Sequence, residues 1–201
     1  MQKTATMITP ADNGRRMTLA EFENADTQNG ALYELGRGII VMMNVPGLKH
    51  FAQVNVIRRQ LAVYEIANPS AIYGIASGSD CKLLIASLES ERHPDIAVYK
   101  TPPPSGPNHW LRWIPELVIE VVSPRGEERD YVEKREEYLR AGVQEYWIFD
   151  AERREFMVLT REGDQWAERR IRPPEKYAST ALPGLEVDCA AVFTAADSVG
   201  P

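Results

Sequence analysis

The sequence predicts an α/β domain, bordering on the α+β class, in which helices flank a mixed, curved sheet. Residues 117–122 form a nearly continuous apolar run of strand length, as expected for a central strand covered on both faces. The best-marked helix signal follows at 129–141, and a second apolar run follows at 145–150. No Gly/Ser linker or charge block divides the 201 residues, so we expect one domain.

The expected domain comprises residues 17–195, with a flexible N-terminal segment at 1–16 and a frayed tail at 196–201. The first segment is polar and contains a proline and an Asn-Gly pair. The chain shows no apolar leader and no run of about eighteen apolar residues, so we expect a cytoplasmic protein without a membrane partner. Cys81 and Cys189 lie far apart and are expected to be reduced thiols.

The charge balance limits the classes of function. The 23 basic and 29 acidic side chains leave a net charge of −6. This argues against a protein that depends on non-specific affinity for nucleic acid, for which a basic surface is the usual sign. It does not exclude a nucleic-acid enzyme, because metal-binding carboxylates make a site acidic while a local basic strip can still hold phosphates.

Local signals place the N-terminal elements. Thr18 and Glu21 have capping-box spacing and, with Met17 and Phe22 as a hydrophobic staple, predict a short helix at 19–25. Glycines at 36 and 38 predict a hairpin of strands at 31–35 and 39–43. A helix at 49–67 is expected to face the core with a stripe of Phe51, Val54, Ile57 or Arg58, Leu61 and Tyr64.

Short apolar runs predict the remaining strands, at 72–76, 81–86, 95–99, 145–150, 155–160 and, more weakly, 165–171. Residues 100–115 carry five prolines and two tryptophans, so we expect an ordered excursion that packs on the core or on a partner. Its apolar surface suits a homodimer. From Pro173 onward we expect loop, with a short strand near Leu185.

The helix expected at 129–141 ends at Gly142, which is typical of a helix C-terminus. Helical spacing predicts a solvated face of Glu133, Glu136, Glu137 and Arg140 and a core face of Tyr131, Val132, Tyr138 and Leu139. Lys134 lies at the edge of the core face and Arg135 lies closer to its centre. Spacing alone does not choose between these two cations.

Glu120 lies within the apolar run and needs a chemical explanation. A buried carboxylate must be paired, metal-bound or protonated, since leaving it ionised and alone costs roughly several kcal/mol. If 95–99 pairs with this run in the antiparallel register that sets Ala97 opposite Val118, Asp95 lies opposite Glu120 on one face. A one-residue slip would separate the two carboxylates.

Asp95, Glu120 and Lys134 are the residue types that metal-assisted phosphodiester hydrolysis requires. The carboxylates supply hard oxygen ligands to Mg²⁺, which lowers the pKa of a bound water. Lys134 near that water would orient it and stabilise developing negative charge. The common nucleotide-binding, zinc-protease and serine-hydrolase signatures are absent from the sequence.

Each of these residues also has a structural interpretation. Glu120 could pair with Arg or Tyr in a buried network, and Asp95 could cap a strand start. Lys134 could form a salt bridge to Asp130 at i, i+4 spacing, a contact worth only about 0.3–0.5 kcal/mol. Tyrosines at 131 and 138 and the tryptophan at 147 are expected to be core residues.

A string of residues in this region adds a resemblance: Asp95, E-V-V at 120–122, Ser123-Pro124, Asp130, Lys134, Tyr138 and G-V-x-E-Y-W at 142–147. The N-terminal part adds MTLAEFEN at 17–24, the YEL-x-x-G hairpin at 33–38 and a His that opens the next helix. On these residues the chain resembles the Uma-two family of restriction endonucleases, within the PD-(D/E)XK nuclease superfamily. The resemblance covers residues 17–160.

The resemblance implies a restriction-endonuclease-like fold and a set of site residues. Asp95 and Glu120 would be the metal-binding acids, the backbone carbonyl of Val121 a further ligand, and Lys134 the catalytic lysine. The chain departs from the superfamily's E-x-K pattern, because position 122 is Val, and the resemblance implies that the lysine has moved to the helix.

The resemblance also implies that Glu34 and His50 are supporting catalytic residues. Their structural alternatives are a solvent-facing strand residue and a residue that serves only the start of a helix.

We therefore expect a metal-dependent endonuclease that uses Mg²⁺, or Mn²⁺ in its place, and acts on nucleic acid, with DNA as the expected substrate. One alternative is a non-enzymatic interaction module that retains a nuclease fold, for which the acidic net charge speaks. Another is a hydrolase of RNA or of a different phosphodiester.

Overall fold

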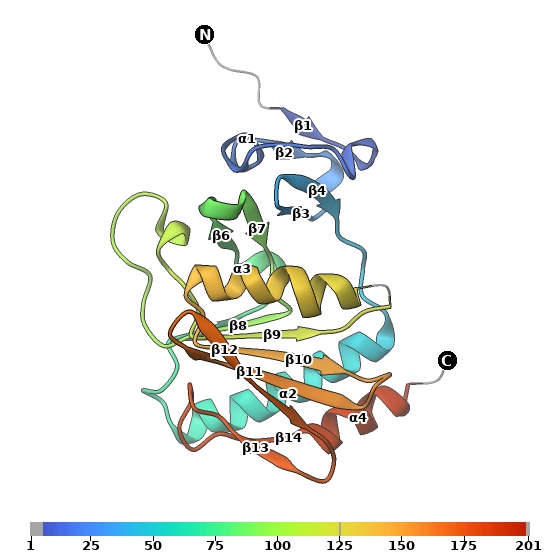
Figure 1. The fold of residues 1–201 in the computed structure, drawn as a ribbon, viewed down its shortest axis with the longest axis vertical. Helices are drawn as coiled ribbons and strands as arrows, with labels where there is room; N and C mark the ends of the chain where they lie inside the picture. The colour runs from blue at the N-terminus through green and yellow to red at the C-terminus, as the bar shows by residue number, and fades with distance from the viewer. Residues whose placement is uncertain (1–5, 125, 200–201) are drawn as a thin grey trace.

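The computed structural model describes residues 6–124 and 126–199. Its centre is a six-stranded sheet with the strand order β12-β11-β10-β9-β8-β5 (Figure 1). β9 and β10 are parallel and the other neighbours are antiparallel, so the sheet is mixed. The strand bounds are β5 Gly74–Ala76, β8 Ile96–Tyr99, β9 Leu117–Val121, β10 Glu145–Asp150, β11 Glu155–Glu162 and β12 Gln165–Ile171.

Helices cover both faces of this sheet. α2 (Leu48–Ala67) and α4 (Cys189–Asp197) lie on one face, and α3 (Lys134–Ala141) lies on the other (Figure 1). Side chains alternate along a strand, so Leu117 and Ile119 face α2 and α4. Val118 packs on the α3 side. Glu120 therefore points toward α3.

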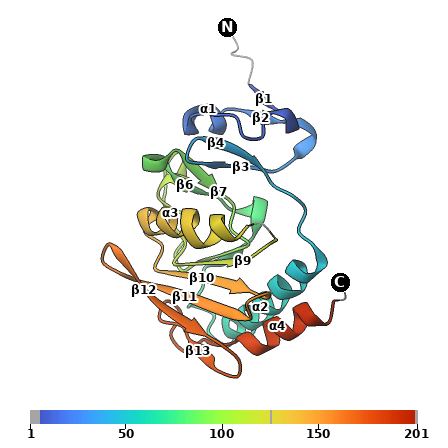
Figure 2. The same cartoon turned by 45° about the vertical axis from the view of Figure 1, so that its right-hand side comes forward.

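A second sheet covers the outer side of α3 (Figure 2). It is antiparallel and has the order β4-β3-β7-β6, with bounds β3 Tyr33–Gly36, β4 Ile39–Met42, β6 Leu83–Ile85 and β7 Ser90–Arg92. Smaller elements include β1 Met7–Ile8, α1 Leu19–Glu23 and β2 Asp26–Thr27 beside this sheet, and β13 Lys176–Ala178 and β14 Glu186–Asp188 near the C-terminus. α3 is thus enclosed between two sheets.

Most of the elements predicted from local signals are present. Thr18 and Glu21 form the capping box of α1, and the hairpin around Gly36 joins β3 to β4. The predicted register is correct, because Ala97 pairs with Val118. The proline-rich excursion packs on the core through its tryptophans, and the Trp113 ring stacks on Tyr99 at a centroid distance of 4.0 Å.

Three predicted side-chain positions are wrong. Phe51 is 63% exposed, because it lines a cavity beside His50 and Asp95 and does not pack in the core. Glu137 is fully buried, because the second sheet covers the face of α3 that was expected to meet water. Val132 is exposed, since a π-helix at Arg129–Glu133 precedes α3 and changes the angular spacing of its residues.

The chain ends also differ from expectation. Of the predicted flexible segment at 1–16, residues 1–5 lie outside the described residues, while Ile8 is buried in the N-terminal core beside Phe22. Near the C-terminus, α4 occupies much of what was expected to be loop, and the side chain of Asp188 accepts a hydrogen bond from the Ala191 amide at its start. Of the predicted tail, residues 200–201 lie outside the described residues.

None of the helices in the described part of the chain combines the length and the apolar character needed to cross a bilayer.

Candidate active site

Antiparallel pairing of β8 with β9 brings Asp95 and Glu120 to the same end of the central sheet. Asp95 directly precedes β8, and its Oδ2 accepts a hydrogen bond from the Val121 backbone N–H at 2.8 Å. The same oxygen lies 2.9 Å from Nε2 of His50, in the first turn of α2. The Asp95 carboxylate is therefore held by a strand and a helix at once.

Glu120 is 2% exposed and lies under α3. Its Oε1 accepts a hydrogen bond from the Tyr138 hydroxyl at 2.5 Å and lies 2.9 Å from Nζ of Lys134. Because Lys134 and Tyr138 are four residues apart, one face of α3 presents both donors to this carboxylate. The helix thus determines where the Glu120 carboxylate points.

Lys134 is the cation that the fold places in this cluster. Its side chain is buried, and Nζ lies 3.0 Å from Oδ1 of Asp130 in addition to its contact with Glu120. The π-helix ends where Lys134 begins α3, and the Lys134 N–H donates to the carbonyl of Arg129. Arg135 points away and pairs with Glu168 of β12 at 2.8 Å. The geometry therefore separates the two cations that sequence spacing left equal.

The charges in this cluster are unbalanced in favour of acid. Burial raises the pKa of Glu120 to about 8, Lys134 opposes the shift, and the negative charge of Asp95 adds to it. Burial likewise raises the pKa of Asp130, against the opposing effect of Lys134. Burial alone would lower the pKa of Lys134, but Asp130 and Glu120 raise it well above its ordinary range. One ammonium group is thus shared by several acids and stays charged at neutral pH.

The oxygens left over in this cluster fit a divalent cation. In the described part of the chain, Oδ1 of Asp95 and Oε2 of Glu120 accept no hydrogen bond. Hard carboxylate oxygens are the ligands that Mg²⁺ prefers, and Mg²⁺ usually keeps several waters and takes only one or two carboxylates. Residues 6–124 and 126–199 contain no group of three or more His, Cys, Asp or Glu side chains placed as metal ligands, so the fit rests on this pair.

Glu34 lies apart from this pair, on β3 of the second sheet. It is fully buried, and its oxygens accept hydrogen bonds from Nη1 of Arg92 at 3.1 Å and from the His93 amide at 3.0 Å. Burial would raise the pKa of Glu34, but the charges of Lys134 and Arg92 lower it below its ordinary value. Of the two supporting residues expected from the sequence, His50 contacts the acid pair, while Glu34 acts on it only through charge.

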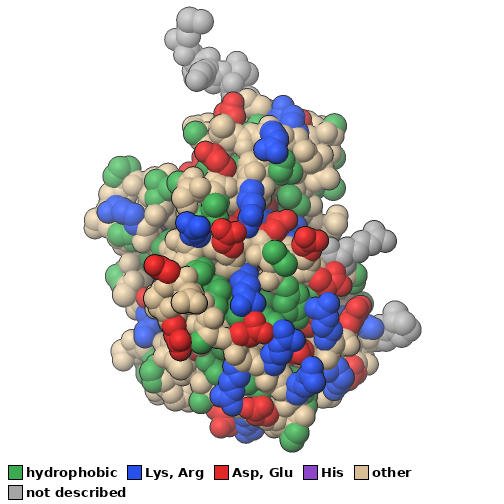
Figure 3. Space-filling model, viewed as in Figure 1, with side chains coloured by type: hydrophobic (Ala, Val, Ile, Leu, Met, Phe, Trp, Pro, Cys, Tyr) green, Lys and Arg blue, Asp and Glu red, His purple; other side chains and the backbone are tan. Residues whose placement is uncertain are grey.

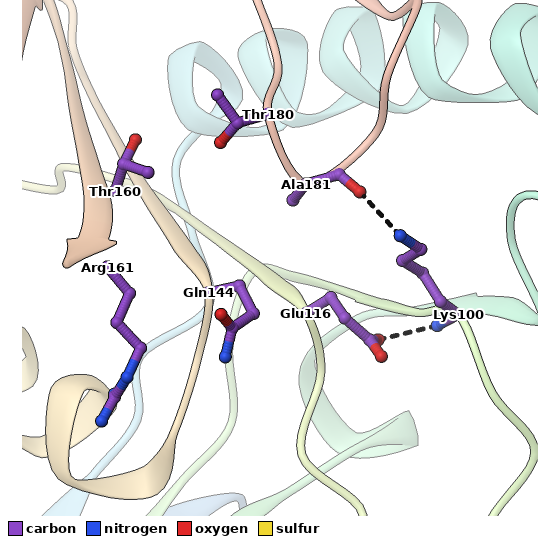
Figure 4. Close-up of a pocket in the computed structure, with 7 residues that line it drawn as sticks. All are labelled: Lys100, Glu116, Gln144, Thr160, Arg161, Thr180 and Ala181. Atoms are coloured by element: carbon purple, nitrogen blue, oxygen red, sulfur yellow. Dashed lines mark hydrogen bonds between the residues drawn. The ribbon is translucent and has the colours of Figure 1, made fainter. Parts of the chain in front are cut away.

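A cavity of about 290 Å³ opens beside Asp95, lined by Val45, Pro46, His50, Phe51, Val54, Gly78 and Asp95. A cavity of about 270 Å³ lies at the opposite end of the central sheet and contains none of the expected site residues (Figure 4). There Lys100 is held by Glu116 and by the carbonyl of Ala181, at 2.8 and 3.0 Å. The cavity beside Asp95 is the one that reaches the candidate site.

Sequence reasoning treated two residues of this site as structural. Tyr138 is buried in the core, as expected, and its hydroxyl also binds Glu120; its i, i+4 spacing from Lys134 was the available signal for this second role. Asp130 belonged to the string that carries the family resemblance, but it was given no role of its own beyond the structural alternative of a surface salt bridge with Lys134. The salt bridge exists, but both side chains are buried in the cluster.

Two carboxylates and a lysine gathered at one end of a mixed sheet suit metal-assisted phosphodiester chemistry. The chain matches the family model described as "Uma2: Putative restriction endonuclease" over residues 19–192, and it belongs to that family. The predicted family and fold class are therefore confirmed.

A solved structure from Anabaena variabilis, described as a putative nuclease belonging to DUF820, shares the fold. Its TM-score is 0.71 and its sequence identity is 18%, over 90% of this chain and 99% of that one. No curated protein matches the chain. The family description supports nuclease activity in general terms.

Proposed function

We propose that the protein is a Mg²⁺-dependent endonuclease that hydrolyses phosphodiester bonds in DNA. The observation that carries the proposal is the convergence of Asp95, Glu120 and Lys134 at one end of the central sheet. An incomplete acid cluster beside a buried, charged lysine is chemically suited to a phosphate and a metal ion. It has no evident use in a purely structural core, because it is unbalanced.

Asp95 and Glu120 would hold the ion through the oxygens that the described residues leave without hydrogen bonds, and the carbonyl of Val121 is the further ligand we propose. The bound ion supplies an acidified water and neutralises charge on the phosphate. His50 and the Val121 amide fix the Asp95 carboxylate from two sides. Tyr138 fixes Glu120.

Lys134 has a defined electrostatic role in this proposal. Because its pKa is raised, its amine keeps its proton at neutral pH and does not act as a general base. It donates hydrogen bonds and stabilises negative charge that develops on the phosphate oxygens. Asp130 holds the amine at 3.0 Å from its other side. Glu34 would support the same ammonium charge from the second sheet.

Plasmid nicking with Mg²⁺ or Mn²⁺ tests the proposal. We expect Glu120→Gln and Lys134→Ala each to lower the nicking rate by about 100-fold or more, since each removes a preorganised electrostatic contact. Arg135→Ala is the matched control, because the neighbouring cation faces Glu168 and should leave the rate close to that of the wild type. Equal nicking by all three variants would show that the activity does not arise here.

Calorimetry with Mn²⁺ separates loss of chemistry from loss of fold. Glu120→Gln should weaken Mn²⁺ binding, because it removes a ligand. Lys134→Ala should bind Mn²⁺ at least as tightly as the wild type, because it removes a competing cation. A Lys134→Ala protein that binds the ion but does not nick DNA would assign Lys134 to the chemistry.

A further inference from the structure

Three arginines gather at the end of the central sheet where the candidate site lies. β10 and β12 run in the same direction as β9, and β11 runs in the opposite direction. The C-terminal ends of β10 and β12 therefore lie at the same end of the sheet as Val121. Arg153 follows β10, Arg170 lies near the end of β12, and Arg172 follows that strand. The candidate site and the three arginines therefore lie at the same end of the central sheet.

These arginines also lie on the same face of the sheet as Glu120. Arg170 pairs across the sheet with Met157, whose side chain packs on the α3 side. Arg170 and Arg172 bind Glu155 at 3.3 and 2.9 Å, and Glu155 is the cross-strand partner of Asp150, which binds Arg153. In Figure 3, Lys and Arg side chains gather over the right-hand ends of β10 to β12, with acidic side chains between them.

The carboxylates of this group are buried and the guanidinium groups are exposed. Asp150 and Glu155 side chains are each 4% exposed, whereas Arg153, Arg170 and Arg172 are 56, 56 and 66% exposed. Asp150 and Glu155 lie beneath the surface and orient the arginines, while the partly exposed Glu168 also accepts a hydrogen bond from Nε of Arg170 at 2.9 Å. An arginine has five N–H donors, and those not used by the carboxylate remain available to an anion.

One residue connects this group to the candidate site. The Tyr131 hydroxyl donates to Oδ2 of Asp150 at 3.1 Å, and its ring lies beneath the Arg153 guanidinium, 5.0 Å from the centroid. Tyr131 directly follows Asp130, which contacts Lys134. The cations thus begin immediately beside the acid cluster. A polyanion that approaches several buried acids needs such compensation.

We propose that Arg153, Arg170 and Arg172 form an arginine strip that binds the phosphate backbone of the nucleic acid leading into the candidate site. This rests on the proposed function, but it concerns binding and is tested without cleavage. Guanidinium groups match phosphate oxygens in geometry and charge. The strip explains how a chain with a net charge of −6 can hold a polyanion.

The test is DNA binding by fluorescence anisotropy, with a labelled duplex in EDTA and at several salt concentrations. The variant R153Q/R170Q/R172Q should bind about tenfold or more weakly, and its slope of log Kd against log salt should fall by about 0.9 for each phosphate that the variant no longer neutralises. The control K100Q/R112Q/R140Q has the same change in charge, and it should keep the wild-type slope. Lys100 and Arg112 lie in the connection from β8 to β9, and Arg140 lies in the last turn of α3.

One substitution should instead increase the affinity for DNA. Glu155→Gln removes the buried charge that holds Arg170 and Arg172, so it should tighten DNA binding severalfold. The triple variant E155Q/R170Q/R172Q removes the two cations and their buried carboxylate together. Because Glu155 is then not left buried without a partner, weaker DNA binding by this variant cannot be attributed to misfolding. That combination should again bind weakly.

The proposal that the arginine strip binds DNA would be overturned if R153Q/R170Q/R172Q kept the wild-type affinity and salt slope. It would also be overturned if R153Q/R170Q/R172Q and the control K100Q/R112Q/R140Q bound DNA equally weakly. Wild-type protein that does not bind DNA would also overturn it. Cleavage is measured separately with Mg²⁺: if nicking fails while the strip variants still bind DNA more weakly than the wild type, the proposed chemistry is wrong and the binding surface stands.

Discussion

Two buried ion clusters lie on opposite sides of α3, and they differ in completeness. In the cluster of the second sheet, all four carboxylate oxygens of Glu34 and Glu137 accept hydrogen bonds, from Arg92, the His93 amide and Ser90. In the cluster of the central sheet, Asp95 and Glu120 each keep one oxygen without a hydrogen bond from the described residues. The first cluster is closed by the protein and the second is left open.

The difference separates a structural role from a functional one. Buried carboxylates that are fully paired stabilise the contact between elements, and here they bind α3 to β3 and β7. Buried carboxylates that are only partly paired destabilise the fold. We expect them mainly where a bound ligand offsets this loss of stability. Burial of an acid is therefore a weak sign of function, and the hydrogen bonds of its two oxygens are a better one.

The largest expected effect is on the closed cluster. Arg92→Met should lower the free energy of unfolding by about 3–5 kcal/mol, because it leaves two buried carboxylates without their partner. Urea denaturation measures the change. Arg135→Met is the control, since its partly exposed pair with Glu168 is worth no more than about 1 kcal/mol. Similar decreases in the two variants would mean that the closed cluster does not hold α3.

A glycine packed against this cluster should show the next largest effect. A Cβ at Gly36 would lie 2.7 Å from Nη2 of Arg92, and the hydrogen bonds to the guanidinium leave it little room to move. Gly36→Ala should cost about 1–3 kcal/mol. Gly74→Ala is the matched strand control, since its Cβ would meet nothing within 4 Å. Thermal unfolding of both variants decides whether the cluster is as rigid as its contacts indicate.

Removing an acid from the open cluster should stabilise the fold, whereas the substitutions at the closed cluster should destabilise it. The pKa of Glu120 lies at about 8, so at pH 7 the folded chain binds a proton that the unfolded chain releases, and the acid destabilises the fold. Without metal, Glu120→Gln should therefore raise the free energy of unfolding, by at most about 3 kcal/mol. A destabilised Glu120→Gln protein in EDTA would place Glu120 among the structural acids.

The pH dependence of stability should distinguish the clusters more finely. The pKa of Glu34 is lowered, so its contribution to stability is present above its ordinary value of 4.5 and is lost as the pH falls through the folded value. Glu34→Gln should be less stable than the wild type at pH 7, and the two should converge in acid. A constant difference across the urea series at falling pH would contradict a charged, stabilising Glu34.

Part of the open cluster could be predicted from the sequence. Glu120 was conspicuous because it interrupts an apolar run. Its position opposite Asp95 depended on one assumed antiparallel register, which the structure has and which strand alternation alone does not fix. Helical spacing alone could not choose between Lys134 and Arg135, because a π-helix alters the angular position of the first turn. Only the family resemblance pointed to Lys134.

The closed cluster could not be predicted. Glu137 has ordinary helical spacing for a solvated face, and only the placement of β7 over α3 buries it. β7 itself, Ser90–Arg92, has no apolar pattern and was not expected as a strand. The role of Arg92 depends on its contacts with Glu34 of β3 and Glu137 of α3, which are distant from it in the sequence. Long-range contacts of this kind are not visible in periodicity or in local propensity.

The most direct test of the open cluster is a crystal structure of the protein with saturating Mn²⁺, using anomalous scattering to locate the ion. We predict one ion bound by Oδ1 of Asp95 and Oε2 of Glu120, with Lys134 still on Oε1 of Glu120. Crystals that hold no ion at this pair, or that place it elsewhere while both carboxylates stay unbound, would contradict a metal-binding role for the open cluster.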